Sequence, residues 1–176
     1  VWTVQLTPVQ LLLPLQLDTQ DSEGEWIAGV VTSGLVLSLG GLAGIIAGPV
    51  AGALSDRTRS RFGRRRPWIV AGTLLTSVAL VLTGLAQNPT AIACAWVAVW
   101  IGLATTSAAL TAMIADRLTF AQRGGASAIV SSTQAIGIVL GVGMVVLLGL
   151  GILESYVLLA LLVLILGLGS AALLPD

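Results

Sequence analysis

Residues 26–54 form an apolar run of about 29 residues without one charged side chain, longer than the roughly 20 residues that a helix needs to cross a bilayer. A membrane β-strand needs only about 9–11 residues of alternating polarity, so runs of this length exclude strands. We therefore predict an all-α integral membrane protein, with residues 1–176 forming one six-helix transmembrane bundle. The predicted spans are about 1–17, 26–54, 67–86, 90–114, 125–150 and 155–174.

The composition indicates that lipid, and not water, is the main solvent of this chain. Hydrophobic residues make up 56% of it and charged residues 9%, and the mean hydropathy is +1.02. Soluble domains carry about 25% charged residues, so a soluble fold is excluded. One cysteine and no histidine leave no expected disulfide or metal site, and we expect no cofactor. No catalytic triad or phosphate-binding loop is present, so an enzyme is not expected.

The arginines predict the orientation of the chain. Residues 56–66 contain six of the eight, residues 116–123 contain the other two, and the acidic loop 18–25 contains none. Short basic loops stay in the cytoplasm, so both chain ends and both arginine loops should be cytoplasmic in a plasma or inner membrane. Attraction of the arginines to anionic lipid acts in the same direction. Nucleic acid is not an expected partner, because the run lies between two spans and has no aromatic platform.

The second span also has a glycine pattern that topology does not require. Small residues four apart let another helix approach closely in lipid. Asp56 follows where this helix leaves the membrane, and a carboxylate there needs a partner. Two interpretations stay open: a latch that forms and breaks during transport, or a clamp that only ties down the loop. The glycines are Gly40, Gly44, Gly48 and Gly52.

The first arginine loop resembles the signature loop of the major facilitator superfamily. The usual second glycine follows the aspartate by three residues, whereas Gly63 follows Asp56 by seven. This longer form resembles the glycoside-pentoside-hexuronide cation symporters, and its Gly-Arg-Arg-Arg-Pro ending is similar to plant sucrose transporters and their bacterial relatives. The residues that carry the resemblance, and that we assign to a cytoplasmic gate, are Gly48, Gly52, Asp56, Arg57, Gly63, Arg64, Arg65 and Arg66.

The second arginine loop extends the resemblance. Asp116, Arg117 and Arg123 are similar to the loop between helices four and five of the same family. The resemblance implies the N-terminal half of a transporter, built from two inverted three-helix repeats. It also implies a second six-helix half, in the same or another chain, because the transport cavity lies between two halves. We expect this chain to be a fragment of such a protein.

Polar side chains inside the spans are candidates for a substrate cavity. They are Gln5, Gln10, Gln16, Trp100, Ser107, Thr111, Ser131 and Gln134. Gln5 and Gln16 are eleven residues apart and return to nearly one helix face. The resemblance implies that helices one, four and five line the cavity. The alternative is that the hydroxyls bond to helix backbones and that the tryptophan packs or lies at the interface.

These residues predict a secondary active transporter that works by alternating access. Amides, hydroxyls and an aromatic ring suit a neutral sugar or glycoside, and the resemblance implies coupling to protons. No acid lies in mid-span, so the coupling candidates are Asp18 and Asp116 at helix ends. A drug or metabolite exporter of the same family is the alternative, and a scaffold or receptor that does not transport is a remote one.

Overall fold

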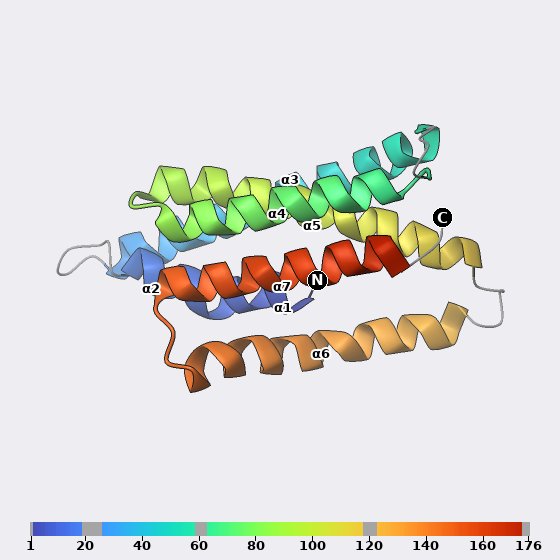
Figure 1. Ribbon diagram of the computed structural model, residues 1–176. Coiled ribbons are helices and arrows are strands. Elements are labelled where there is room, and N and C mark those ends of the chain that lie inside the picture. Colours follow the sequence, from blue (N-terminus) through green and yellow to red (C-terminus); the bar gives the residue numbers. More distant parts are fainter. Residues whose placement is uncertain (1, 19–25, 59–62, 118–122, 174–176) are drawn as a thin grey trace.

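The computed structural model describes residues 2–18, 26–58, 63–117 and 123–173, and no strand occurs among them (Figure 1). The first segment has three parts, and five longer helices follow. They are α1 (Trp2–Thr7), the π-helical turn η1 (Pro8–Leu12), α2 (Leu13–Asp18), α3 (Trp26–Arg57), α4 (Arg66–Leu85), α5 (Pro89–Arg117), α6 (Arg123–Leu147) and α7 (Ile152–Leu173).

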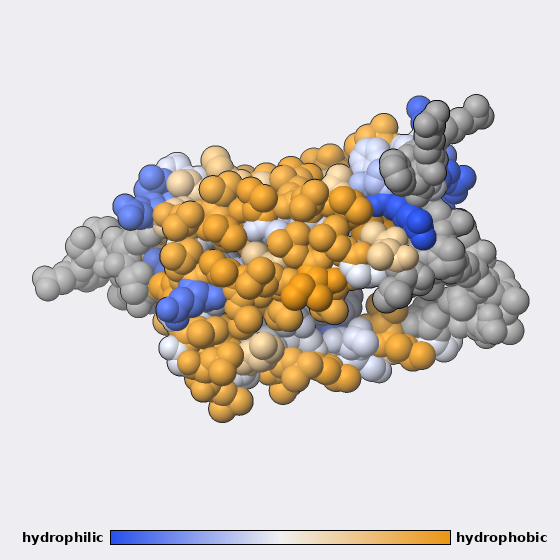
Figure 2. All heavy atoms as spheres, in the orientation of Figure 1, coloured by the Kyte–Doolittle hydropathy of each residue, from blue (hydrophilic) through white to orange (hydrophobic). Residues whose placement is uncertain are grey.

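Five helices, α3 to α7, are long and apolar enough to cross a membrane. Hydrophobic residues cover most of the visible middle of the bundle, and hydrophilic residues lie toward its two ends (Figure 2). The prediction of an all-helical, multi-pass membrane protein is therefore confirmed. The prediction that residues 1–17 form a sixth span is not tested by helix length, because the described part of that segment is divided into three short pieces.

The junction between α3 and α4 lies at one end of the bundle, called the arginine end below. Helix α3 continues through Asp56 to Arg57, so the carboxylate lies in its last turn. Gly63 has a φ of 96°, a conformation that glycine adopts without steric cost. Pro67 lies in the first turn of α4, where its missing N–H costs no helical hydrogen bond. These residue types explain why one helix stops and the next begins.

Helices α4 and α5 touch through their backbones. A Cβ atom added to Gly72 would lie 2.8 Å from the Gly102 carbonyl oxygen, and one added to Gly102 would lie 2.9 Å from that of Gly72. Thr76 and Thr106 complete the two Gly-x-x-x-Thr motifs, and their hydroxyls donate to the carbonyls of Gly72 and Gly102 at 2.8 and 3.0 Å. Small residues thus allow the close packing on which helix association in lipid depends.

Helices α4 and α7 pack in the same manner. A Cβ atom on Gly167 would lie 2.5 Å from the Cγ2 methyl of Thr73. The Ser77 hydroxyl lies 2.9 Å from the Thr73 carbonyl and 3.1 Å from the Ala160 carbonyl on α7. A Cβ atom on Gly84 would lie 3.0 Å from the Cβ of Tyr156. Glycine on one helix and a hydroxyl or aromatic residue on the other therefore form this interface along its length.

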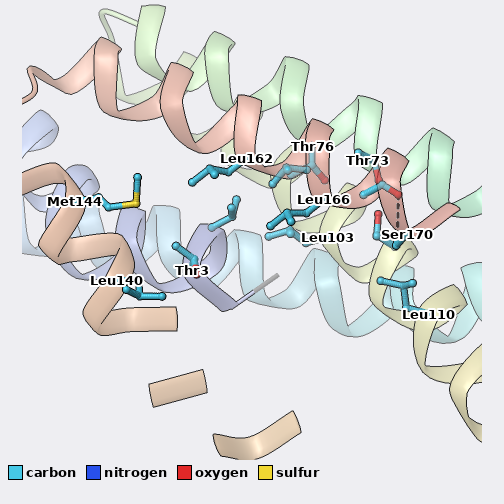
Figure 3. Close-up of a pocket in the computed structure, with 14 residues that line it drawn as sticks. Thr3, Thr73, Thr76, Leu103, Leu110, Leu140, Met144, Leu162, Leu166 and Ser170 are labelled. Atoms are coloured by element: carbon cyan, nitrogen blue, oxygen red, sulfur yellow. Dashed lines mark hydrogen bonds between the residues drawn. The ribbon is translucent and has the colours of Figure 1, made fainter. Parts of the chain in front are cut away.

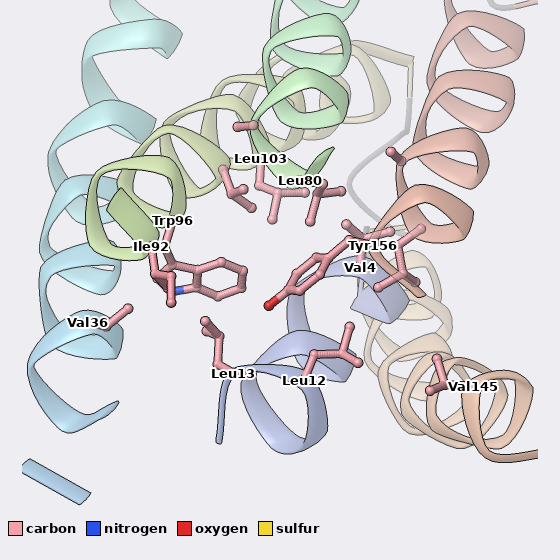
Figure 4. Close-up of a cluster of buried hydrophobic side chains, with 14 of the residues drawn as sticks. Val4, Leu12, Leu13, Val36, Leu80, Ile92, Trp96, Leu103, Val145 and Tyr156 are labelled. Atoms are coloured by element: carbon pink, nitrogen blue, oxygen red, sulfur yellow. The ribbon is translucent and has the colours of Figure 1, made fainter. Parts of the chain in front are cut away.

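The largest buried cluster joins helices that are far apart in sequence (Figure 4). Trp96 of α5 and Tyr156 of α7 are its largest side chains, and both are fully buried. Leu12 and Leu13 bring the first segment into the same cluster. Close packing at many atoms stabilises such a core in lipid, where the surrounding solvent is as apolar as the side chains.

Helix α6 stands apart from the other long helices and packs mainly on α1 (Figure 1). A Cβ atom on Gly137 would lie 3.0 Å from the Thr3 backbone nitrogen, and Gly141 faces the Thr7 side chain. Gly137 and Gly141 are four residues apart, so they form one small face on α6. This interface is the main contact of α6 with the bundle.

The two prolines of the first segment account for its π-helical turn. Pro8 and Pro14 have no N–H, so neither can close the α-helical turn to the carbonyl four residues before it. The Leu13 N–H instead donates to the Pro8 carbonyl, five residues back. Such π turns are frequent at functional sites.

Candidate functional site

Two arginines of the first arginine loop pair with the Asp56 carboxylate. The Nη2 atoms of Arg64 and Arg65 lie 3.4 and 3.3 Å from Asp56 Oδ1. The Arg65 side chain is 6% exposed, whereas that of Asp56 is 58% exposed. The Arg64 pair is exposed on both sides and contributes at most about 1 kcal/mol, whereas Arg65 brings a buried guanidinium to the carboxylate. The carboxylate stays open to a further partner.

Uncharged side chains reinforce the same junction. The Trp68 indole N–H donates to the Thr58 hydroxyl at 2.9 Å, which ties the start of α4 to the end of α3. The buried Ser55 hydroxyl donates to the Gly52 carbonyl at 2.8 Å. These bonds agree with the clamp interpretation of the loop, and the exposure of Asp56 leaves the latch interpretation open.

The glycine face of α3 is divided into two parts. Gly40 and Gly44 lie against Trp100, whose Cδ1 and Cε3 atoms would be 2.5 and 2.7 Å from Cβ atoms added there. Nothing lies within 4 Å of Cβ atoms added at Gly48 and Gly52. The half nearer the arginine end is therefore uncovered.

The other predicted gate residues are placed less completely. Arg57 ends α3 and is exposed, and Arg66 begins α4. Asp116 and Arg117 end α5, Arg123 begins α6 and Asp18 ends α2, but their side chains lie outside the described part of the structure. The proposed roles of these four residues stay predictions.

The three glutamines of the first segment have three different environments. Gln16 is buried, and its Nε2 donates to the carbonyls of Thr83 and Ala86 at 2.8 and 3.1 Å. These carbonyls lie at the end of α4, so Gln16 satisfies a helix terminus. Gln5 is half-buried and Gln10 is exposed. The π turn shifts the helical phase, so spacing does not predict a common face for Gln5 and Gln16.

The cavity candidates on α5, Trp100, Ser107 and Thr111, also have different environments. Trp100 packs on α3, and its indole N–H is buried without a hydrogen-bond partner in the described residues. Ser107 is half-buried and Thr111 is exposed. In this structure Trp100 fills the space above two glycines, so packing accounts for it without a substrate.

Polar residues of α6 face outward. Ser131 and Gln134 are exposed. Ser132 and Thr133 between them donate to carbonyls of their own helix, Ala128 at 2.9 Å and Val130 at 2.6 Å. The backbone-bonding alternative therefore holds for these two hydroxyls, and the amide of Gln134 is the larger polar group left on this face.

A cavity of about 330 Å³ lies among α1, α4, α5, α6 and α7 (Figure 3). The cavity was not predicted from the sequence, although the Gly-x-x-x-Thr spacing on α4 and α5 was a usable signal. Three of its five hydroxyls donate to carbonyls of their own helices, so its walls are nearly apolar. The hydroxyls belong to Thr3, Thr73, Thr76, Thr106 and Ser170, and the rest of the lining includes Leu103, Leu110, Leu140, Met144, Leu162 and Leu166.

A second hollow, of about 680 Å³, separates the first segment from α3. Gln10 lines it and is joined there by Ser33, by Gly29 and Gly34, and by apolar side chains. It is called the Gln10 groove below. In the described residues, no three His, Cys, Asp or Glu side chains come together as metal ligands.

Comparison with known proteins places this geometry in a family. The sequence profile of the Major Facilitator Superfamily matches residues 4–176. The general alpha-glucoside permease of Schizosaccharomyces pombe is 39% identical over 90 residues, which are 49% of this chain and 14% of the permease. The sucrose transport protein SUT4 of Oryza sativa is 33% identical over 91 residues, 49% of this chain and 13% of SUT4.

A third relative is the sucrose transport protein SUC4 of Arabidopsis thaliana, 43% identical over 49 residues, which are 28% of this chain and 10% of that protein. Each match thus covers a small share of the relative's length. No solved structure matches. The profile covers nearly the whole chain, and the chain therefore belongs to the Major Facilitator Superfamily, a family of membrane transporters and not of enzymes.

Proposed function

We propose that this protein is a secondary active transporter that carries a neutral sugar or glycoside by alternating access, with protons as the coupling ion. The observation that carries the proposal is the similarity to an alpha-glucoside permease and to sucrose transport proteins. The uncharged polar groups on the open faces of the bundle, Gln10 and Gln134, support a neutral substrate.

Helix pairing supports a six-helix half built from two three-helix repeats, with residues 2–18 as the first helix. In each repeat the second helix would carry two glycines four residues apart, Gly40 and Gly44 on α3 or Gly137 and Gly141 on α6. Each pair packs on the first helix of the other repeat, α5 or α1. The third helices, α4 and α7, pack on each other. An internal pseudo-two-fold axis produces this pattern.

The uncovered part of α3 supports a second half as partner and a latch at the arginine end. Gly48 and Gly52 leave room for another helix, and Asp56 follows them one turn later with its carboxylate exposed. The positive N-terminus of a partner helix would pair favourably with this carboxylate. By the distribution of the arginines, this end is cytoplasmic.

Export of an apolar compound is the second candidate. The nearly apolar walls of the cavity in Figure 3 favour it. Proteoliposomes containing the full-length gene product separate the two candidates: external sucrose or another glucoside should acidify the lumen of a proton-coupled sugar symporter. Folded, correctly inserted protein that moves neither sugar nor protons would contradict the sugar proposal.

A further inference from the structure

We propose that the Gln10 groove is a sugar-binding subsite, in which the Gln10 amide and the Ser33 hydroxyl bond to the hydroxyls of the substrate. This inference rests on the proposed function and deepens it, because it selects one of the three glutamines and adds a residue of α3. The groove of about 680 Å³ lies between the first segment and α3, which pack on each other through α2.

The environment of Gln10 is the first argument. Its side chain is exposed, and it makes no hydrogen bond among the described residues. Gln10 lies eight residues before Asp18, or about 12 Å along the helix, which is well inside a hydrocarbon core of about 30 Å. An amide that faces lipid without a partner is costly to bury, so this face must meet water, a polar solute or a polar group of the second half.

The hydrogen bonds and positions of the other two glutamines are the second argument. Gln16 already donates to two carbonyls at the end of α4. Gln5 is half-buried on the other side of the π turn and does not line the groove. Gln10 itself lies within the π turn, so the proline-driven change of helical register accompanies the exposed amide of this segment.

The walls of the groove are the third argument, and they point to an uncharged polyol. No charged side chain lines it, so an ionic substrate would find no counter-charge. Leu11, Leu15, Val30 and Leu37 supply an apolar surface for one face of a sugar ring. Nothing lies within 4 Å of a Cβ atom added at Gly34, so the glycine leaves open space on the α3 side.

The cavity in Figure 3 is a poorer sugar site on the same criteria. Thr76, Thr106 and Ser170 donate their protons to backbone carbonyls of their own helices. Its lining contains no amide, carboxylate or aromatic side chain. A sugar with many hydroxyls would lose its bonds to water there and regain few.

Two matched pairs of variants test the inference in the full-length gene product. Gly34→Leu fills the groove, whereas Gly41→Leu adds the same side chain on the same helix where the space is also open. Gln10→Ala removes the groove amide, and Gln87→Ala removes an exposed amide beyond the end of α4, outside the groove. The measurement is initial-rate uptake of radiolabelled sucrose, with folded yield checked by gel filtration.

We expect Gln10→Ala to raise KM by about three- to tenfold, the factor for one neutral hydrogen bond, with Vmax and yield little changed. Gly34→Leu should raise KM by more than Gln10→Ala, and both controls should behave as wild type. Equal effects of Gly34→Leu and Gly41→Leu, or a loss of Vmax at constant KM, would make the groove a lipid or helix contact and overturn the subsite. Wild-type protein without sugar uptake would overturn the proposed function itself.

Discussion

Helices α3, α4, α5 and α7 form a tightly interlocked group, whereas α6 packs mainly on α1. In the group, α5 packs on both α3 and α4, and α4 also packs on α7. Glycines bring backbones into contact at Gly72 and Gly102, or admit a tryptophan at Gly40 and Gly44. The α1–α6 pair has one interface, and α6 presents a run of exposed residues from Ala128 to Ile136.

The first segment belongs to both regions. Its first part, α1, packs on α6, while α2 packs on α3 and Gln16 bonds to the end of α4. The π turn joins the two parts. Stability in proteins is distributed unevenly, and elements that move or bind ligands have few packed contacts. Close packing thus identifies the scaffold of the bundle, and available polar groups such as Gln10 and Gln134 lie where few side chains are packed together.

The largest expected effect is at the contact between α4 and α5. Gly102→Leu would push a side chain against the Gly72 carbonyl and Thr76, where there is no space. Overpacking commonly costs about 1–3 kcal/mol, and a backbone obstacle places this change at or beyond the upper end. We expect little folded protein after detergent extraction. Gly41→Leu is the control, and equal yields for the two variants would show that the scaffold is not close-packed there.

Trp100→Ala should act within the same group. Removal of the indole leaves Gly40 and Gly44 without their packing partner, at a cost of about 3 kcal/mol by analogy with large-to-small core changes. Thermal unfolding in detergent should show a lower Tm, while KM for sugar in the surviving protein stays near wild type. A raised KM at unchanged Tm would restore Trp100 to the substrate cavity.

Asp56→Asn probes the uncovered end of α3. The substitution keeps the size of the side chain and removes the charge that a latch needs. If the latched state loses about 1.4 kcal/mol of stabilisation, the transport rate should fall about tenfold. Insertion and folded yield should not change, because Asp56 is exposed. A variant that transports at the wild-type rate would support only the interpretation in which Asp56 ties down the loop.

The smallest effect is expected at Gln16. Gln16→Leu removes the side-chain donor from the carbonyls of Thr83 and Ala86, while Thr83 keeps the Ala86 backbone N–H at 3.3 Å, so the cost should be about 1 kcal/mol. Gln10→Leu, on the same segment, should not lower the Tm, because Gln10 bonds to nothing in the described structure. Equal Tm values for the two variants would remove the distinction between a structural and an available glutamine.

The sequence predicted the helices better than their contacts. Length and hydropathy are local properties, so the apolar run of α3 and the arginine loop could be identified directly. A glycine face indicates that another helix or a large side chain can pack closely there, but it does not identify which one. Trp100 is a cavity candidate by its residue type; the structure shows it packed on Gly40 and Gly44, and its role in the cavity stays a prediction.

The contact at Gly72 and Gly102 was missed because a lone Gly-x-x-x-Thr spacing is common in membrane helices. Gln16 could not be separated from Gln10 by residue type, because only the fold shows which amide meets the end of α4. The π turn had a signal in Pro8 and Pro14, but the register that prolines impose depends on the packing around them.

The central claim is that the uncovered face of α3 opens and closes as sugar is carried. Replacing Cys94, the one cysteine of this chain, together with any cysteine in the rest of the full-length protein permits a single reporter cysteine at Gly48, where added atoms meet nothing. We would measure its labelling rate with a membrane-impermeant maleimide, in inside-out vesicles that contain the full-length gene product, with and without saturating sucrose. The account predicts a labelling rate that changes with sugar in wild type and much less in Asp56→Asn. A rate that is the same with and without sugar, in vesicles that do transport it, would contradict the account.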